Sequence, residues 1–229
     1  MLYWLAAGLG TFLIGLSKAG FATGLGMLTT PLITMVLPAQ QTLGLILPLL
    51  CFADWWTIYV YWRQWQFRLV SMILLGAIPG IVAGTVFVNS ISSTVLKKSI
   101  GWTTLVFVLL LLIRQIWFPK TAYVPRWWHS FIVGIIAGFT STIAHAAGPI
   151  IAIFLLAQKI DKKLFVATSA IYFTIGNLMK VPPYIYTGVL NWTVFVKAVY
   201  LFPVVPLGVL AGWWANKHLP QIVFNYIVY

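Results

Sequence analysis

Long apolar runs, separated by short charged or turn-forming segments, occupy nearly the whole chain. Several of them exceed the roughly 20 residues that a membrane-spanning helix needs. The pattern predicts helices at about residues 2–19, 21–37, 41–62, 68–89, 98–118, 128–144, 147–158, 163–187, 192–215 and from 219 onward. The last run is too short to cross a membrane, whereas the corresponding run at 98–118 is long enough. We therefore expect that the chain is cut short at its C-terminal end.

Two glycine-broken polar segments interrupt the apolar pattern, one in each half of the chain. The first extends from Gly15 to Pro31, and the second from Gly138 to Pro149. Glycine and proline weaken helices, and backbone without helical hydrogen bonds is tolerated at membrane depth only where it is buried in protein or lines a cavity. Matched breaks in two halves therefore point to the substrate site of a transporter.

Composition places this chain in a lipid bilayer. Hydrophobic residues make up 62% of it and charged residues 7%, and the mean hydropathy is +0.99. Fourteen lysines and arginines oppose two acids, but most of the basic residues sit in short loops, where they act as topology signals rather than as a nucleic-acid surface. We expect a multi-pass, all-α protein of the inner (plasma) membrane. The single cysteine, Cys51, excludes a disulfide within the chain, and we expect no metal and no cofactor.

The distribution of basic residues predicts the topology. If each glycine-broken segment crosses the membrane, the basic loops fall on both faces without bias. If each is a hairpin that returns to its own side, nearly all basic residues share one face and only Lys97 and Lys98 lie opposite. The positive-inside rule favours hairpins, with both termini outside. Each half then has an odd number of passes, so we predict two inverted repeats, residues 1–118 and 128–229, joined by a loop at 119–127.

In this arrangement the glycine-broken hairpins meet near the bilayer midplane. The halves also match outside the breaks, since Asp54 aligns with Asn177 and the glycine spacing of residues 76–84 resembles that of 203–212. Small residues at such spacings let helices approach closely, so helix packing is the simpler interpretation of these glycines.

A few ionisable residues lie inside apolar runs, where each charge costs about 2.5 to 3.5 kcal/mol unless it is paired or hydrated. They are Lys18, Asp54, His145, Lys180 and Lys197. Lys180 follows Asn177 by three residues, which places both side chains on one helix face. Two residues after Lys180 comes the pair Pro182-Pro183, which we expect to end or kink that helix.

Each of these residues also has a structural interpretation. The long stem of Lys18 could extend its charge to the headgroups, and Lys180 could be interfacial. Asp54 could be a structural partner of Arg63 or Lys180, and His145 could be a hydrogen-bonded core histidine.

Together, the polar groups at the breaks indicate a desolvated anion site. Opened backbone N–H groups, a lysine from each half and several hydroxyls would supply the donors. The hydroxyls are those of Ser17, Thr23, Thr140, Ser141 and Thr142. Our candidate substrate-binding residues are Lys18, Thr23, Gly24, Thr140, Thr142, His145, Asn177 and Lys180. Asp54 and His145 are the candidate proton carriers, because Asp54 is the acid well inside an apolar run and histidine titrates near neutral pH.

These residues resemble the TauE/SafE sulfite exporter family, also called the toluene sulfonate uptake permease group. The resemblance covers nearly the whole chain and lies in Thr29-Thr-Pro-Leu32, Ala53-Asp54, Tyr61-Trp-Arg63, Thr142 to Pro149, Phe165-Val-Ala-Thr168 and Phe173 to Pro182. It implies an integral membrane transporter for small sulfur-containing anions such as sulfite, sulfoacetate or other organosulfonates, often moved outward. The glycine-rich repeat segments of the family map onto Gly20, Gly24, Gly26 and Gly148. Here Ala144, Ala146 and Ala147 stand where several glycines are common, which leaves the width of the second break open.

Other functions are less well supported than transport of a small anion. An anion channel or a structural membrane subunit would share the composition, and a test for saturable flux separates them from a carrier. An intramembrane enzyme could pair Ser17 with His145, but the chain has no Gly-x-Ser-x-Gly motif, no His-Glu-x-x-His motif and no glutamate. The direction, the coupling ion and the oligomeric state, including a homodimer, stay open.

Overall fold

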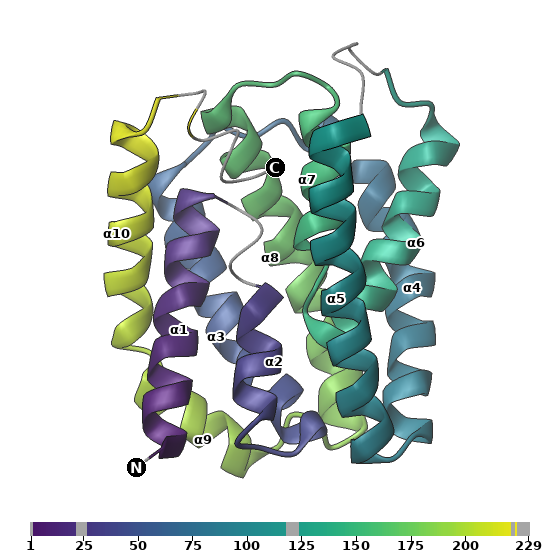
Figure 1. The fold of residues 1–229 in the computed structure, drawn as a ribbon, viewed down its shortest axis with the longest axis vertical. Coiled ribbons are helices and arrows are strands. Elements are labelled where there is room, and N and C mark those ends of the chain that lie inside the picture. Colours follow the sequence, from purple (N-terminus) through teal and green to yellow (C-terminus); the bar gives the residue numbers. More distant parts are fainter. Residues whose placement is uncertain (1, 22–26, 118–123, 221–222, 224–229) are drawn as a thin grey trace.

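The computed structural model describes residues 2–21, 27–117, 124–220 and 223, and among them the side chains of residues 2, 3 and 111–117 are not described. Every regular element in this part of the chain is helical (Figure 1), which confirms the all-α prediction. The elements are α1 (Leu2–Gly20), α2 (Thr29–Thr34), α3 (Ala39–Val60), the 3₁₀ turn η2 (Phe67–Leu69), α4 (Ser71–Ser90), α5 (Ser93–Trp117), α6 (Trp127–Ala144), α7 (Gly148–Leu156), α8 (Lys162–Tyr186), α9 (Trp192–Leu201) and α10 (Val204–His218). Among the described residues, five helices are long and apolar enough to cross a membrane, or up to six if the bent pair α9–α10 is one span.

Both glycine-broken segments return to the end of the molecule from which they start (Figure 1). Helix α1 rises from the lower end, and α2 runs back to it. Helix α6 descends from the upper end, stops part-way, and is followed by α7, which returns upward. This is the course that the hairpin interpretation requires. The inverted relation between the halves and the repeat boundaries stay predictions, and residues 22–26 and 118–123 lie outside the described part.

The turn between α6 and α7 has a clear local cause. His145 ends α6 in a left-handed conformation with a φ of 51°, and its N–H donates to the Ser141 carbonyl at 3.0 Å. The next N–H, from Ala146, donates to the Thr140 carbonyl at 3.3 Å, which closes the last turn of the helix. Helix α7 then begins at Gly148, and a proline is well tolerated in the first turn that follows. The turn therefore holds His145 inside the bundle.

Prolines explain two differences from the predicted helices. The run at 192–215 is not one helix: α9 and α10 meet at a bend of 51°. Pro203 lies at this bend and has no N–H to continue the hydrogen-bond ladder. Of the two outcomes expected at Pro182-Pro183, an end or a kink of the helix, the end was wrong, because α8 continues to Tyr186. Each proline lacks the N–H that would bond the carbonyl four residues earlier, and α8 nevertheless continues for three residues beyond Pro183.

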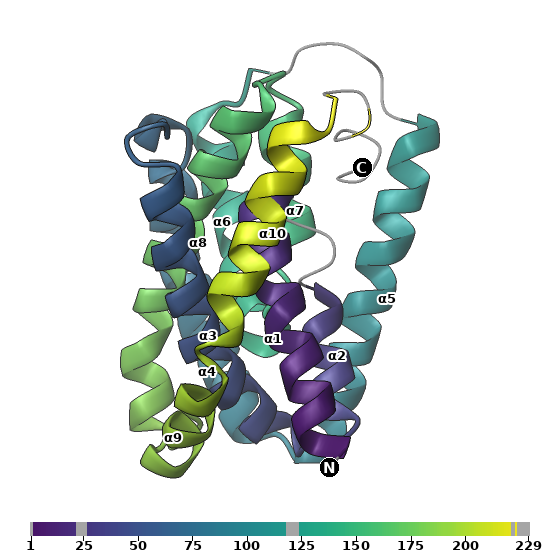
Figure 2. The ribbon, with the colours of Figure 1, turned by 90° about the vertical axis from the view of Figure 1, so that its left-hand side faces the viewer.

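Glycines bring two pairs of helices into backbone contact. Helix α10 lies along α1 (Figure 2), and a Cβ atom on Gly15 would stand 2.6 Å from the Val205 carbonyl oxygen. Helices α4 and α6 pack in the same way, since a Cβ on Gly76 would overlap the Phe131 carbonyl. Helix α5 stands at the edge of the bundle (Figure 2). In its most apolar stretch 22% of the residues are buried inside the molecule, whereas the value for α3 is 61%. The buried α3 packs against α8, and this contact carries the polar groups described next.

Candidate functional site

A carboxylate is buried where α3 meets α8. Asp54 on α3 is fully inaccessible to solvent, and its Oδ2 accepts a 2.6 Å hydrogen bond from Nδ2 of Asn177 on α8. Its Oδ1 lies 2.6 Å from Nζ of Lys18 on α1. Asp54 and Asn177, which occupy equivalent positions when the two halves are aligned, are thus in direct contact.

Lys18 is held by two groups. Besides Asp54, its Nζ lies 3.9 Å from the centroid of the Phe173 ring, a cation–π arrangement. The Lys18 side chain is 10% exposed. It therefore points into the bundle, and an extension of its charge to the headgroups does not describe this residue.

Lys180 is fully buried one turn after Asn177. Its Nζ donates to Ser141 Oγ at 2.9 Å, to the Ser141 carbonyl at 3.3 Å and to His145 Nδ1 at 3.1 Å. Three acceptors match the three hydrogens of an ammonium group. None of these partners carries a negative charge, so the charge of Lys180 is solvated but not neutralised by them.

The hydrogen bonds of His145 assign its tautomer. Nε2 lies 3.0 Å from the carbonyl oxygen of Leu43, which can only accept, so Nε2 carries the hydrogen. If Lys180 is an ammonium, which can only donate, Nδ1 is the acceptor of their 3.1 Å contact and carries no hydrogen. A neutral His145 thus positions the Lys180 ammonium, and a doubly protonated ring would turn an N–H toward it.

Two candidate threonines use their hydroxyl hydrogens within α6. Thr140 Oγ1 donates to the Ile136 carbonyl and Thr142 Oγ1 to the Gly138 carbonyl, each at 2.8 Å. Ser141, between them, is the hydroxyl that contacts Lys180. Successive helical residues point about 100° apart, so three adjacent hydroxyls cannot all face α8. The other two candidates in the breaks, Thr23 and Gly24, lie outside the described residues.

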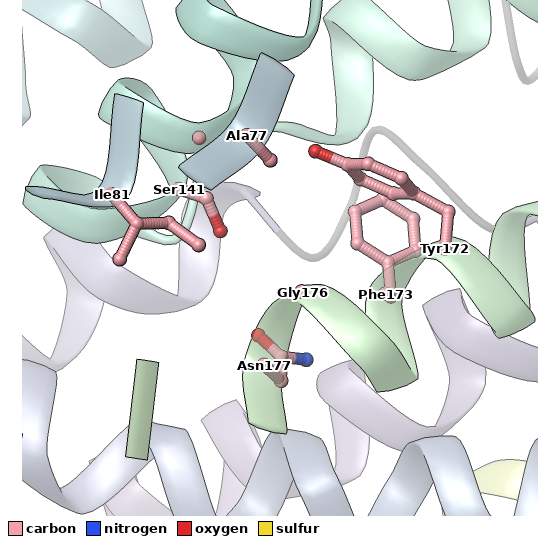
Figure 3. A pocket seen from close by; sticks show the side chains of 8 residues that line it. Ala77, Ile81, Ser141, Tyr172, Phe173, Gly176 and Asn177 are labelled. Carbon is pink, nitrogen blue, oxygen red and sulfur yellow. The ribbon is translucent and has the colours of Figure 1, made fainter. Parts of the chain in front are cut away.

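A crevice joins the two polar groups (Figure 3). Ser141 and Asn177 point into it, and Tyr172 adds a phenol hydroxyl to its lining. Its other lining residues, mostly apolar, are Ala77, Ile81, Gly138, Tyr172, Phe173 and Gly176. The crevice has no room for a water molecule in this conformation. The crevice therefore lies between Ser141, which bonds Lys180, and Asn177, which bonds Asp54. In this conformation it is closed to a substrate.

The charges of this cluster do not cancel. With both lysines protonated, Asp54 ionised and His145 neutral, Lys18 and Asp54 neutralise one another and Lys180 leaves one positive charge in excess. Phe173 was not singled out from the sequence as a site residue, and Ser141 was named among the hydroxyls at the breaks but not among the candidate binding residues. Their roles depend on which helices face α1 and α8. No group of three His, Cys, Asp or Glu side chains among the described residues could hold a metal ion.

The family comparison agrees with this chemistry. A family model described as "Sulfite exporter TauE/SafE" matches residues 7–229. The chain belongs to this family. The resemblance found in the sequence is confirmed over essentially the whole chain, and the family is one of membrane transporters. No curated protein and no solved structure gives a significant match.

Proposed function

We propose that the chain moves small sulfur-containing anions, such as sulfite, sulfoacetate or another organosulfonate, outward across the plasma membrane. The observation that carries the proposal is Lys180, a fully buried lysine whose three partners are all uncharged. A lone charge at membrane depth costs about 2.5 to 3.5 kcal/mol. A bound anion would offset the cost of burying the Lys180 charge, which accounts for a lysine at this position.

The crevice supports a substrate with a polar head and a small apolar tail. An oxyanion between Ser141 and Asn177 would lie beside the ammonium of Lys180. The Ser141 hydroxyl and the second amide N–H of Asn177, whose Nδ2 already donates to Asp54, would be further donors. The apolar wall formed by Ala77, Ile81 and the neighbouring aromatic rings suits the carbon end of a sulfonate. Lys18 acts on the anion through Asp54, and His145 through Lys180.

The packing of the helices supports two inverted repeats and alternating access. The first helix of each half packs against the second crossing of the other half: α1 against α10 of the bent pair α9–α10, and α6 against α4. Asp54 and Asn177, which the alignment of the halves makes equivalent, touch where the central helices α3 and α8 meet. Because the crevice is closed in this conformation, passage of a substrate requires the two halves to rearrange around it.

Flux in proteoliposomes tests the proposal. We expect saturable sulfite transport that sulfoacetate inhibits, with sulfate and thiosulfate as further competing anions and protein-free liposomes as the background. Lys180→Met should raise the apparent KM at least about tenfold, because a hydrogen bond to a charged group contributes about 1.5 to 3 kcal/mol. Flux that never saturates would favour a channel. Flux no greater than that of empty liposomes for all four anions would contradict the proposal.

A further inference from the structure

Asp54 is the one acid among the buried charges of the site. The chain contains two acids, and the other, Asp161, is exposed and caps the N-terminus of α8. Asp54, Lys18 and Lys180 are all buried, with exposed fractions of 0%, 8% and 0%. Water does not screen the charge of Asp54, so this carboxylate contributes directly to the charge balance that a substrate meets.

The groups around Asp54 come from three helices. Lys18 approaches it from α1 and Lys180 acts on it from α8, while Cys51 lies on its own helix, α3. His145 faces Lys180 rather than Asp54. With Asp54 ionised, Cys51 and His145 neutral and both lysines charged, the cluster has one positive charge in excess. With a proton on Asp54 it has two.

We propose that Asp54 sets the charge of the anion that the site accepts, and that the site takes a monoanion when Asp54 is ionised and a dianion when Asp54 carries a proton from solution. The inference rests on the proposed function, because it concerns the same anion site. Both bound states have the same total charge, namely zero. A dianion beside an ionised Asp54 would instead leave one negative charge uncompensated among buried groups, which is costly.

Three variants separate the charge of the cluster from its hydrogen bonds. Asp54→Asn raises the excess charge to two with nearly the same side-chain shape. The double variant Lys18→Met/Asp54→Asn removes both members of the ion pair and restores an excess of one. Asp161→Asn is the matched control, because it removes the same charge at the surface and asparagine also caps helices well.

Methanesulfonate and sulfate are suitable probes, since they share a tetrahedral sulfur with several oxygens and carry one and two negative charges throughout the neutral range. Their equilibrium binding to the purified full chain is measured by calorimetry. We expect Asp54→Asn to raise the ratio of sulfate to methanesulfonate affinity about tenfold or more, since one unscreened charge changes. The double variant and Asp161→Asn should keep the wild-type ratio.

The pH dependence of binding gives a second measurement, which starts from the wild type and so does not require a variant to fold. If a dianion binds together with one proton, the sulfate affinity of the wild type should rise as the pH falls, by up to about tenfold per pH unit. Methanesulfonate affinity should not rise, and sulfate binding to Asp54→Asn should lose this slope.

The outcomes distinguish the inference from the function beneath it. An affinity ratio that is the same in Asp54→Asn and in the wild type, or a pH slope that survives in Asp54→Asn, would overturn the role of Asp54 while leaving an anion site in place. A wild type that binds neither anion would overturn the site itself, and the flux measurement then decides whether the proposed function fails with it. If Asp54→Asn does not fold, the pH slope of sulfate binding to the double variant replaces it, and a persisting slope overturns the proposal.

Discussion

At the scale of single residues, the main result is the partner of the buried acid. From the sequence, Arg63 and Lys180 were the structural partners considered for Asp54. The structure pairs it with Lys18 and Asn177 instead. The reason is geometric, because α1 passes beside α3 at the depth of Asp54. The periodicity of a segment shows which residues share a face of that helix, but not which other helix this face meets.

This pairing changes what removal of Lys18 should do. We expect Lys18→Met to lower the free energy of unfolding by about 3 to 5 kcal/mol, because it leaves the buried carboxylate of Asp54 without its counter-charge. The double variant Lys18→Met/Asp54→Asn should lose clearly less, since neither charge remains. Thermal unfolding in detergent measures both. Equal destabilisation by the single and the double variant would mean that the ion pair is not what holds Lys18.

At the scale of helices, contact through glycine decides which elements pair. Gly134 and Gly138 on α6 face α4, and Gly208 and Gly212 on α10 face α1, each with a backbone atom where a Cβ would be. The sequence predicted close packing for the glycines of residues 76–84 and for Gly208 and Gly212, and this is confirmed, whereas Gly134 and Gly138 were not predicted. It could not name the partner helix, because a small residue permits close approach to any helix that presents a matching groove.

A methyl group tests this contact. We expect Gly76→Ala to destabilise the protein by about 1 to 3 kcal/mol, because the new Cβ would overlap the Phe131 carbonyl and the helices would have to separate. Gly101→Ala in α5 is the matched control, since a Cβ there meets nothing within 4 Å. The control should leave the melting temperature unchanged or raise it slightly, as alanine favours helix. A fall in Gly101→Ala as large as that in Gly76→Ala would assign the effect to the helix rather than to the contact.

At the scale of the whole molecule, the basic connections gather at one end. The connections between α3 and α4 and between α7 and α8 lie at the upper end in Figure 1, and the connection between α4 and α5 lies at the lower end. The first two carry Arg63, Arg68 and Lys159. Lys97 and Lys98 stand near the start of α5, at the opposite end. The positive-inside rule therefore predicts that the upper end faces the cytoplasm.

Labelling of single cysteines in intact cells tests this orientation. In a Cys51→Ser background, cysteines at the exposed positions Gln64 and Asp161 should be protected from impermeant external reagents. A cysteine at the exposed position Asn89, near the end of α4, should react. Permeabilised cells give the control, because all three positions should then be labelled. External reaction at Asp161 with protection at Gln64 would refute the hairpin topology.

The class of the protein, its helices and its two interruptions could be derived from the chain alone, because they depend on local quantities. Hydrophobicity, the length of apolar runs and the positions of glycine, proline and charge are all written in consecutive residues. Local rules were applied incompletely at two prolines: Pro203 bends the run that was predicted as one helix, and α8 continues through Pro182-Pro183 to Tyr186.

The site itself is a tertiary property. The sequence could place Lys18, Asp54, Asn177 and Lys180 inside the membrane, but their pairing depends on how α1, α3, α6 and α8 cross. The choice of Ser141 over its two threonine neighbours depends on the rotation of α6 about its axis, about 100° per residue. The excess positive charge of the cluster follows from composition, whereas its location beside the crevice, at Lys180, was decided by the fold, because Asp54 can neutralise only the lysine that reaches it.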